Sequence, residues 1–176
     1  MSHPPFVPAD FVVPRGLTTD RFRLEPLAPD HNTADHAAWT TSITHIRATP
    51  GYTGRGWPPE AGMTPEENLG DLRRHARDFE RRTGFTYSVI GIPDGEVIGC
   101  VYIYPVRDEH GATSTEPGET APGAPDRAPG PGPAPDATVR SWVRADRADL
   151  DRPLYEAVRD WLAADWPFRT VAYAAR

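Results

Sequence analysis

Apolar and polar residues alternate along the segment 18–27, where single apolar side chains are separated by arginine or glutamate. This period of two is typical of a strand that buries one face. Two further apolar segments, 85–90 and 96–104, flank the sequence Pro93-Asp94-Gly95, which favours a tight turn. They predict a β-hairpin whose second strand is apolar on both faces, as in the centre of a covered sheet. Gly99 within that strand predicts a bulge or a close approach of another backbone.

The segment 64–83 has the pattern of an amphipathic helix. Thr64 is in the N-cap position, Pro65 is the first helical residue, and Glu67 can complete a capping box. The apolar stripe consists of Leu69, Leu72, Ala76 and Phe79. Gly84 is predicted to end the helix in the left-handed conformation.

The outer face of this helix is rich in arginine. Arg74 and Arg82 each lie four residues from Asp78, a spacing that favours solvated ion pairs over an anion-binding patch. A shorter helix is predicted at 32–42, and the following segment 45–63 reads as irregular because prolines and glycines interrupt it.

The C-terminal segment predicts a strand at 137–144, a short polar loop, a helix at 152–166 and a last strand at 168–176. Such a strand–loop–helix unit directs the N–H groups of the helix N-terminus at whatever lies beyond the strand, which suits an anion. The loop holds no glycine and three aspartates, Asp146, Asp149 and Asp151.

The remaining segments define the expected domain organisation. Residues 1–16 carry several prolines and predict an extended arm. Residues 17–176 predict one domain, interrupted by a Pro/Gly-rich insertion at 106–136 whose composition is that of a disordered segment. Tyr52 and Trp57 lie in the irregular segment, where they can either pack a loop onto the core or line a substrate lid.

Composition excludes several classes of protein. The formal net charge of −6 disfavours a nucleic-acid-binding protein, whose binding face would be basic. The single cysteine, Cys100, forbids an internal disulfide and fits a reducing compartment. No apolar segment approaches the length of a membrane span, and the N-terminus has no pattern of a signal peptide, so we expect a cytoplasmic protein.

The histidines show no spacing typical of a metal site, so no metal is expected. His45, beside the aromatic loop, is the one histidine considered as a general base, against the alternative of ordinary packing. Tyr102 and Tyr104 end the central strand and can face an acceptor cavity or belong to the core.

The order of these elements, strand–helix–helix–hairpin–strand–helix–strand, resembles that of the GNAT acetyltransferase superfamily. Residues 19–27 resemble the opening strand of that family, and residues 95–103, with G-x-x-I-G before an apolar strand, resemble its central hairpin. The resemblance implies an α/β (α+β) fold with a mixed, mostly antiparallel central sheet flanked by helices. It implies an N-acyltransferase that moves an acetyl group from acetyl-CoA to a small-molecule or peptide amine.

In that family the CoA diphosphate lies on a glycine-containing loop that opens the helix after the fourth strand. The resemblance therefore implies cofactor binding by Trp142, Val143, Arg144, Arg147 and Arg152. Leu150 and Arg152 fall where the family has glycines, and the aspartates would repel a diphosphate. The alternative is a helix N-terminus with Asp151 as its N-cap, in a GNAT-fold binding or assembly protein that no longer binds CoA.

The family continues past its fifth strand, whereas few residues follow Tyr173 here. We therefore expect an open sheet edge, which favours a homodimer.

Overall fold

The computed structural model describes residues 4–106 and 135–176. Residues 107–134, nearly all of the insertion predicted to be disordered, lie outside the described residues. Within the described ranges, a single sheet contains the strands β1 (Leu17–Thr18), β2 (Phe22–Pro26), β3 (Phe85–Gly91), β4 (Val97–Pro105), β5 (Ala137–Val143) and β6 (Val171–Tyr173). The strands lie side by side in chain order, and every neighbouring pair is antiparallel except β5 and β6, which are parallel.

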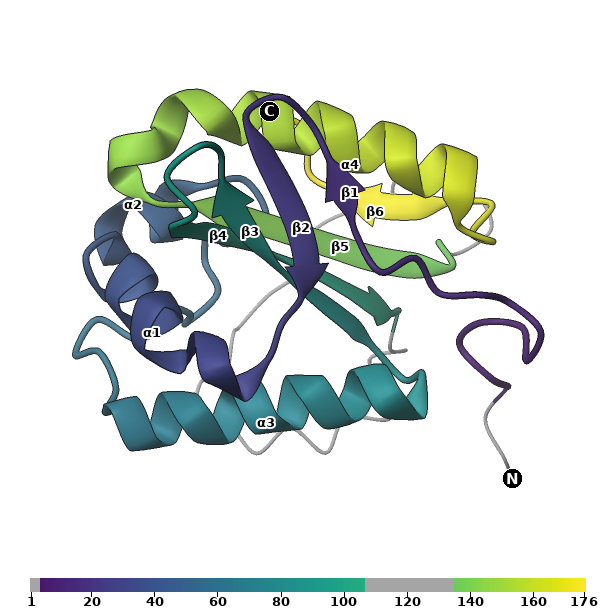
Figure 1. The fold of residues 1–176 in the computed structure, drawn as a ribbon, viewed down its shortest axis with the longest axis horizontal. Coiled ribbons are helices and arrows are strands. Elements are labelled where there is room, and N and C mark those ends of the chain that lie inside the picture. The colour runs from purple at the N-terminus through teal and green to yellow at the C-terminus, as the bar shows by residue number, and fades with distance from the viewer. Residues whose placement is uncertain (1–3, 107–134) are drawn as a thin grey trace, which may run out of the picture.

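Helices cover both faces of this sheet (Figure 1). One face carries α1 (Asn32–Thr40), α2 (Ile43–Ala48) and α3 (Pro65–Arg81), and the opposite face carries α4 (Asp151–Asp165). Two short 3-10 helices, η1 (Pro29–His31) and η2 (Ala145–Leu150), precede α1 and α4. The predicted fold class, a mostly antiparallel mixed sheet flanked by helices, is confirmed.

The prediction from the sequence omitted one helix and made one strand too long. Helix α2 lies partly within the segment predicted to be irregular, where it is held by the fully buried Ile46. Strand β6 pairs over three residues only, against the nine predicted. The capping box of α3 is confirmed: Thr64 Oγ1 accepts from the Glu67 N–H at 3.2 Å, and Glu67 accepts from the Thr64 N–H at 2.8 Å.

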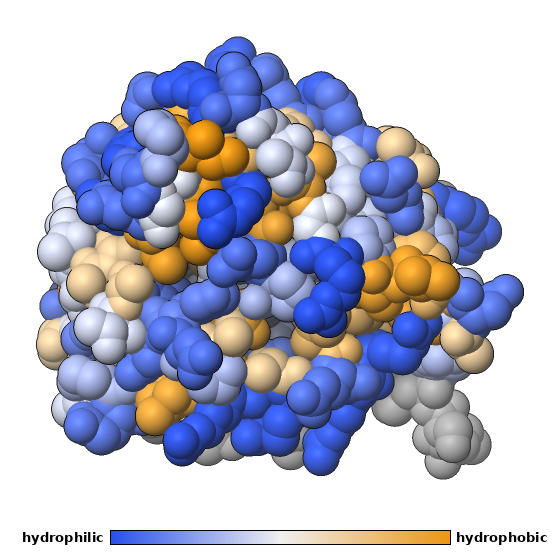
Figure 2. Space-filling view, in the orientation of Figure 1, coloured by the Kyte–Doolittle hydropathy of each residue, from blue (hydrophilic) through white to orange (hydrophobic). Residues whose placement is uncertain are grey.

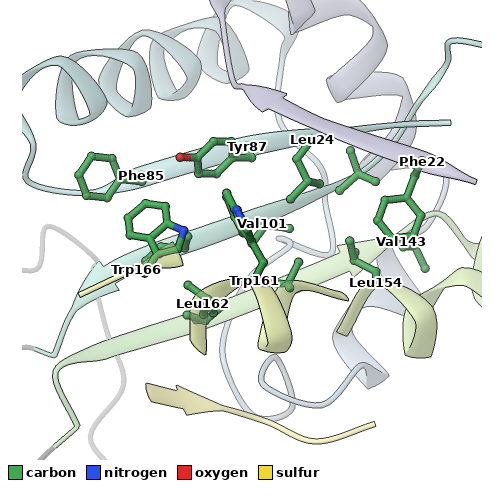
Figure 3. Close-up of a cluster of buried hydrophobic side chains, with 14 of the residues drawn as sticks. Phe22, Leu24, Phe85, Tyr87, Val101, Val143, Leu154, Trp161, Leu162 and Trp166 are labelled. Carbon is green, nitrogen blue, oxygen red and sulfur yellow. The ribbon is translucent and has the colours of Figure 1, made fainter. Parts of the chain in front are cut away.

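The core on the α4 side is built from aromatic and branched side chains (Figure 3). Trp161, Leu154 and Leu162 of α4 point at side chains of the central strands, among them Tyr87 and Val101. The N-terminal arm packs against the same cluster: Phe6 stacks on Phe85 at 5.8 Å between ring centroids. The described residues of the arm form neither helix nor strand.

The core on the other face contains a buried polar link between α1 and α3. Trp39 Nε1 donates to Asn68 Oδ1 at 3.0 Å, and Asn68 Nδ2 donates to Asp35 Oδ2 at 3.0 Å. Burial raises the pKa of the Asp35 carboxyl, and the bond from Asn68 opposes this rise. The link satisfies polar groups that would otherwise be costly to bury.

Close contacts explain two glycines for which the sequence made a prediction. A Cβ on Gly99 would overlap the carbonyl oxygen of Trp142, so the predicted close backbone approach is confirmed. The prediction for Gly84 was wrong: the left-handed residue at the end of α3 is Arg82, with φ 60°. Gly84 is small for another reason, because a Cβ there would overlap the Tyr104 ring.

The ion pairs predicted on α3 are also wrong. Arg74 pairs with Asp71 at 3.1 Å, and the guanidinium of Arg82 donates to the carbonyl oxygens of Pro8 and Phe11. Arg82 therefore holds the N-terminal arm against the end of the helix.

The surface in Figure 2 is mostly hydrophilic, and its largest group of apolar residues gathers around the β3–β4 hairpin. A smaller apolar group lies on the N-terminal arm, where Val12 is 84% exposed. Within the described ranges, no helix has the length and apolar character needed to cross a membrane.

Candidate functional site

The parallel strands β5 and β6 part halfway along β5. Their register joins Ala137 to Val171 and ends with Val139 opposite Tyr173. In the described chain, the second half of β5 therefore has a strand partner on the β4 side only. The backbone groups along its other edge can bind something other than a strand.

Arg176 lies in this gap, with a side chain that is only 4% exposed. Its Nη2 donates to the carbonyl oxygen of Ser141 at 2.8 Å, and its Nη1 donates to that of Pro50 at 3.1 Å. Its Nε donates to Asp151 Oδ2 at 2.6 Å. The prediction of Asp151 as the N-cap of α4 is therefore wrong, because its carboxylate binds Arg176 and makes no capping hydrogen bond.

The loop between β5 and α4 turns its backbone donors inward. The N–H of Arg147 donates to the carbonyl of Arg144, and the N–H of Asp151 donates to the carbonyl of Ala148. Pro153, in the first turn of α4, has no N–H to offer. The 3-10 turn thus uses up donors that a glycine-rich loop would present to a phosphate.

Two of the arginines predicted to bind a cofactor are bound to carboxylates of this loop and of the β3–β4 turn. Arg144 donates to Asp146 at 2.9 and 2.5 Å and to Glu96 at 3.0 Å. Arg147 pairs with Asp94, and its bond lowers the pKa of that carboxyl. The bond from Arg144 likewise lowers the pKa of Asp146.

The other residues predicted to bind a cofactor are dispersed. Arg152 is exposed on the first turn of α4, and within the described residues it makes no ion pair. Trp142 and Val143 are both buried, on opposite faces of β5. The structure therefore brings Arg144 and Arg147 together at the β3–β4 turn, whereas Trp142 and Val143 are enclosed in the core.

Trp142 instead joins an aromatic cluster centred on Trp57. The Trp57 ring lies 5.6 Å from Tyr52, 5.9 Å from Trp39, 6.2 Å from Tyr102 and 6.3 Å from Trp142. Trp142 Nε1 donates to the Tyr102 hydroxyl at 3.2 Å. Residues named separately from the sequence, two as substrate contacts and one as a catalytic candidate, thus share one site.

Tyr52 is only 3% exposed, so it packs the loop onto the core. Its hydroxyl is buried and has no hydrogen-bond partner among the described residues. Burial raises the pKa of the hydroxyl, and the positive charge of Arg140 opposes this rise.

Arg140, which lies opposite Tyr102 in the β4–β5 register, is not among the site residues predicted from the sequence. It is half-buried, and its pKa is lowered first by burial and then by the nearby charge of Arg55. The alternation of side chains along β5 could have indicated Arg140, because it places Arg140 on the same face as Trp142.

The two remaining catalytic candidates have different surroundings. His45 lies on α2, and its ring nitrogen Nε2 is buried without a partner among the described residues. The Tyr104 hydroxyl donates to Asp78 Oδ2 at 3.0 Å and lies 2.7 Å from His75 Nδ1, which ties it to α3. Burial lowers the pKa of His75 to about 4.

An open groove of about 640 Å³ lies beside the β5–α4 loop. Its walls are α1, the β3–β4 turn and the start of η2, with Ala34, Ala38, Glu96 and Arg144 among the lining residues. No three His, Cys, Asp or Glu side chains of residues 4–106 and 135–176 are arranged to hold a metal ion.

Neither the known protein-family models nor the curated proteins contain a match to this sequence. Solved structures do match. The ribosomal L7/L12 alpha-N-protein acetyltransferase RimL, in complex with coenzyme A, aligns with a TM-score of 0.54 and 10% identity over 84% of this chain and 64% of its own. An acetyltransferase from Agrobacterium tumefaciens aligns with a TM-score of 0.51 and 19% identity, over 93% of this chain and 75% of its own.

The GNAT domain of PAT from S. lividans aligns with a TM-score of 0.50 and 16% identity, over 86% of this chain and 71% of that domain. The chain spans about two thirds of the length of RimL. At these identities the likeness shows the fold. This chain has the fold of the GNAT acetyltransferases.

Proposed function

We propose that this chain transfers an acyl group from an acyl-CoA thioester, with acetyl-CoA as the first donor to test, to an amine. The observation that carries the proposal is the parting of β5 and β6 in a chain with the GNAT fold. An extended ligand can pair with the free edge of β5 as an added strand would. The solved neighbours support this function, since they are named acetyltransferases and one was solved with coenzyme A.

The gap suits the amide-containing arm of the donor once Arg176 moves. The arm would then take over the hydrogen bond at Ser141 O that Arg176 now makes. The donor therefore competes with the Arg176–Asp151 ion pair for this edge.

The diphosphate end requires a different contact from a glycine-rich loop. Because the loop donors turn inward, side chains must supply the positive charge, and Arg152 at the first turn of α4 is exposed and available. The positive end of the α4 dipole adds to its effect. Arg21, which pairs with Asp149 at 2.6 Å, neutralises one of the acids nearby.

The chemistry needs a proton acceptor and an oxyanion donor. The amine nitrogen forms a bond to the thioester carbonyl carbon, the C–S bond breaks, and the thiol leaves with a proton. His45 is the candidate base, because its buried Nε2 has no partner among the described residues. N–H groups on the free edge of β5 would polarise the thioester carbonyl.

Thermal unfolding in the presence of acetyl-CoA tests donor binding directly. At 100 times Kd the ligand should stabilise the protein by about 2.7 kcal/mol. Arg152→Ala should weaken binding, whereas Arg159→Ala, an exposed arginine on the same helix, should leave it unchanged. If millimolar acetyl-CoA gives no stabilisation, acetyl transfer is excluded.

His45→Gln tests the base. For an amine that the wild type acylates, the variant should lose roughly 100-fold or more in kcat with little change in donor affinity. Equal rates for the two proteins would remove His45 from the mechanism.

A further inference from the structure

One face of β5 carries a positive charge among aromatic side chains. Side chains alternate along a strand, so Arg140 and Trp142 share the face that is covered by α2 and the loop after it. Arg140 lies opposite Tyr102, and its Cγ is 3.8 Å from the position that a Cβ on Gly51 would take. The guanidinium therefore belongs to a half-buried site rather than to the open surface.

Arg140 has no carboxylate partner in the described residues. The arginines of the β5–α4 loop pair with acids, and Arg176 does so in the gap. Within residues 4–106 and 135–176, the ion pairs and hydrogen bonds include none from the Arg140 guanidinium. Partial burial of a charge is costly without a counter-charge, so a half-buried guanidinium with no acid beside it among the described residues is complementary to an anion.

The hydroxyl of Tyr52 is an independent observation that points the same way. Tyr52 is 97% buried, being 3% exposed, and its O–H has no acceptor among the described residues. Burial raises the pKa of this hydroxyl, and the charges of Arg140 and Arg176 both oppose this rise. A buried donor without an acceptor is uncommon in folded proteins. A cation and an unpaired donor together form a site that lacks an acceptor.

The site lies beside the gap between β5 and β6. Pro50, next to Gly51, accepts a hydrogen bond from Arg176 in the gap, and Gly51 lies against Ala174. The start of η2 is five residues beyond Arg140, or roughly 16 Å at the rise of a strand. An anion at Arg140 is therefore next to the proposed acyl group and separate from the diphosphate end of the donor.

We propose that Arg140 and Tyr52 bind a carboxylate of the acceptor. The acceptor class is then an amine that carries its own carboxylate, such as an amino acid or a peptide with a nearby acidic group. This inference rests on the proposed function, because the bound amine is an acceptor only if the protein catalyses acyl transfer. One half-buried guanidinium balances the single negative charge of a carboxylate.

Calorimetric titration of the full chain tests the site without any acyl-CoA. The probes are three amino acids, β-alanine, L-leucine and L-phenylalanine, and the three amines that lack only the carboxyl group, ethylamine, 3-methylbutylamine and 2-phenylethylamine. At least one acid should bind about 10-fold or more tightly than its matched amine, the loss expected when a charge-assisted hydrogen bond is removed. If no acid binds at about 10 mM, or if each binds no better than its amine, the proposal is overturned.

Two variants locate the preference. Arg140→Gln should bring acid and amine to equal affinity, and Tyr52→Phe should reduce the preference several-fold while leaving the fold intact. Arg23→Gln, a half-buried arginine on β2 that pairs with Glu25 at 3.5 Å, is the matched control and should retain the full preference. Retention of the preference by both Arg140→Gln and Tyr52→Phe would overturn the assignment.

The two proposals fail separately. If acetyl-CoA binds and amines without carboxylates are acylated as fast as those with them, the proposed function stands and the carboxylate site falls. If the acids bind through Arg140 but acetyl-CoA does not bind, the anion site stands as a binding site and acetyl transfer falls.

Discussion

Replacing Asp151 with asparagine should lower the stability of the protein and raise its affinity for acetyl-CoA. The carboxylate and the Arg176 guanidinium are 18% and 4% exposed and lie 2.6 Å apart. Breaking such a pair leaves a charge buried without a partner and costs about 3–5 kcal/mol. We expect the low end, about 3 kcal/mol, because the asparagine oxygen can still accept from Nε and Arg176 keeps its bond to Ser141 O.

Donor affinity should move in the opposite direction. Without the carboxylate, Arg176 is held less firmly in the gap, and the N-terminus of α4 loses a negative charge that repels a diphosphate. We expect acetyl-CoA to bind about 10-fold more tightly, which corresponds to about 1.4 kcal/mol. Arg176→Met should act in the same direction, because it empties the gap of the guanidinium.

The assay is urea unfolding and acetyl-CoA titration of both single variants and the double variant. The effects of the two substitutions on the free energy of unfolding should deviate from additivity by about 2 kcal/mol, as expected for two residues in one buried pair. Asp160→Asn is the control: its partner Arg159 lies on the same helix, but the two side chains are 70% and 53% exposed, so the change should stay below about 0.5 kcal/mol. Additive effects on stability, or an affinity that falls in both single variants, would refute the competition between Arg176 and the donor.

Three further predictions concern the scaffold. Because the folded pKa of His75, about 4, lies below the unfolded value near 6.5, the neutral ring stabilises the fold fully above pH 6.5 and this contribution is lost as the pH falls toward 4. The loss should approach about 3 kcal/mol in urea midpoints measured from pH 8 to pH 4 and should be absent in His75→Asn. Gly84→Ala should destabilise the protein by about 1–3 kcal/mol, because the new Cβ would overlap the Tyr104 ring. Gly70→Ala, which has open space around it on α3, should stabilise the protein by up to about 1 kcal/mol. Equal effects of the two substitutions in calorimetry would contradict this explanation. Thr64→Ala should cost about 1 kcal/mol in the same measurement through loss of the cap, and no change would show that the capping box contributes nothing.

Features set by neighbouring residues could be predicted from the sequence. The capping box at Thr64 and the hairpin around Pro93 depend on side chains and turns within a few residues, and both were correct. The alternation of apolar residues indicated the sheet, because a strand with a covered face leaves a period-two pattern. The six residues of α2 were missed, because a helix that short depends on burial of Ile46 rather than on local signals.

Features set by distant partners could not be predicted. Asp151 has the position and type of an N-cap, but its carboxylate binds Arg176, 25 residues later. Gly84 has the position of a helix cap, but the ring that requires its small size comes from Tyr104 on β4. Tyr52, Trp57 and Tyr102 were considered for separate reasons, and only the fold brings them together around Trp142.

Strand β5 offers the proposed donor and the proposed acceptor two different sets of groups, which point in perpendicular directions. Its backbone edge lies in the plane of the sheet and faces the gap to β6, whereas the side chains of Arg140 and Trp142 project out of that plane. A donor on the edge and an acceptor on the face can therefore be bound at the same time. It follows that Arg140→Gln should leave the affinity for acetyl-CoA unchanged within about twofold, because the Arg140 side chain lies off the edge that the donor would occupy. A large change in that affinity, measured in the same titration, would mean that donor and acceptor share one site, and the division of β5 into edge and face would be wrong.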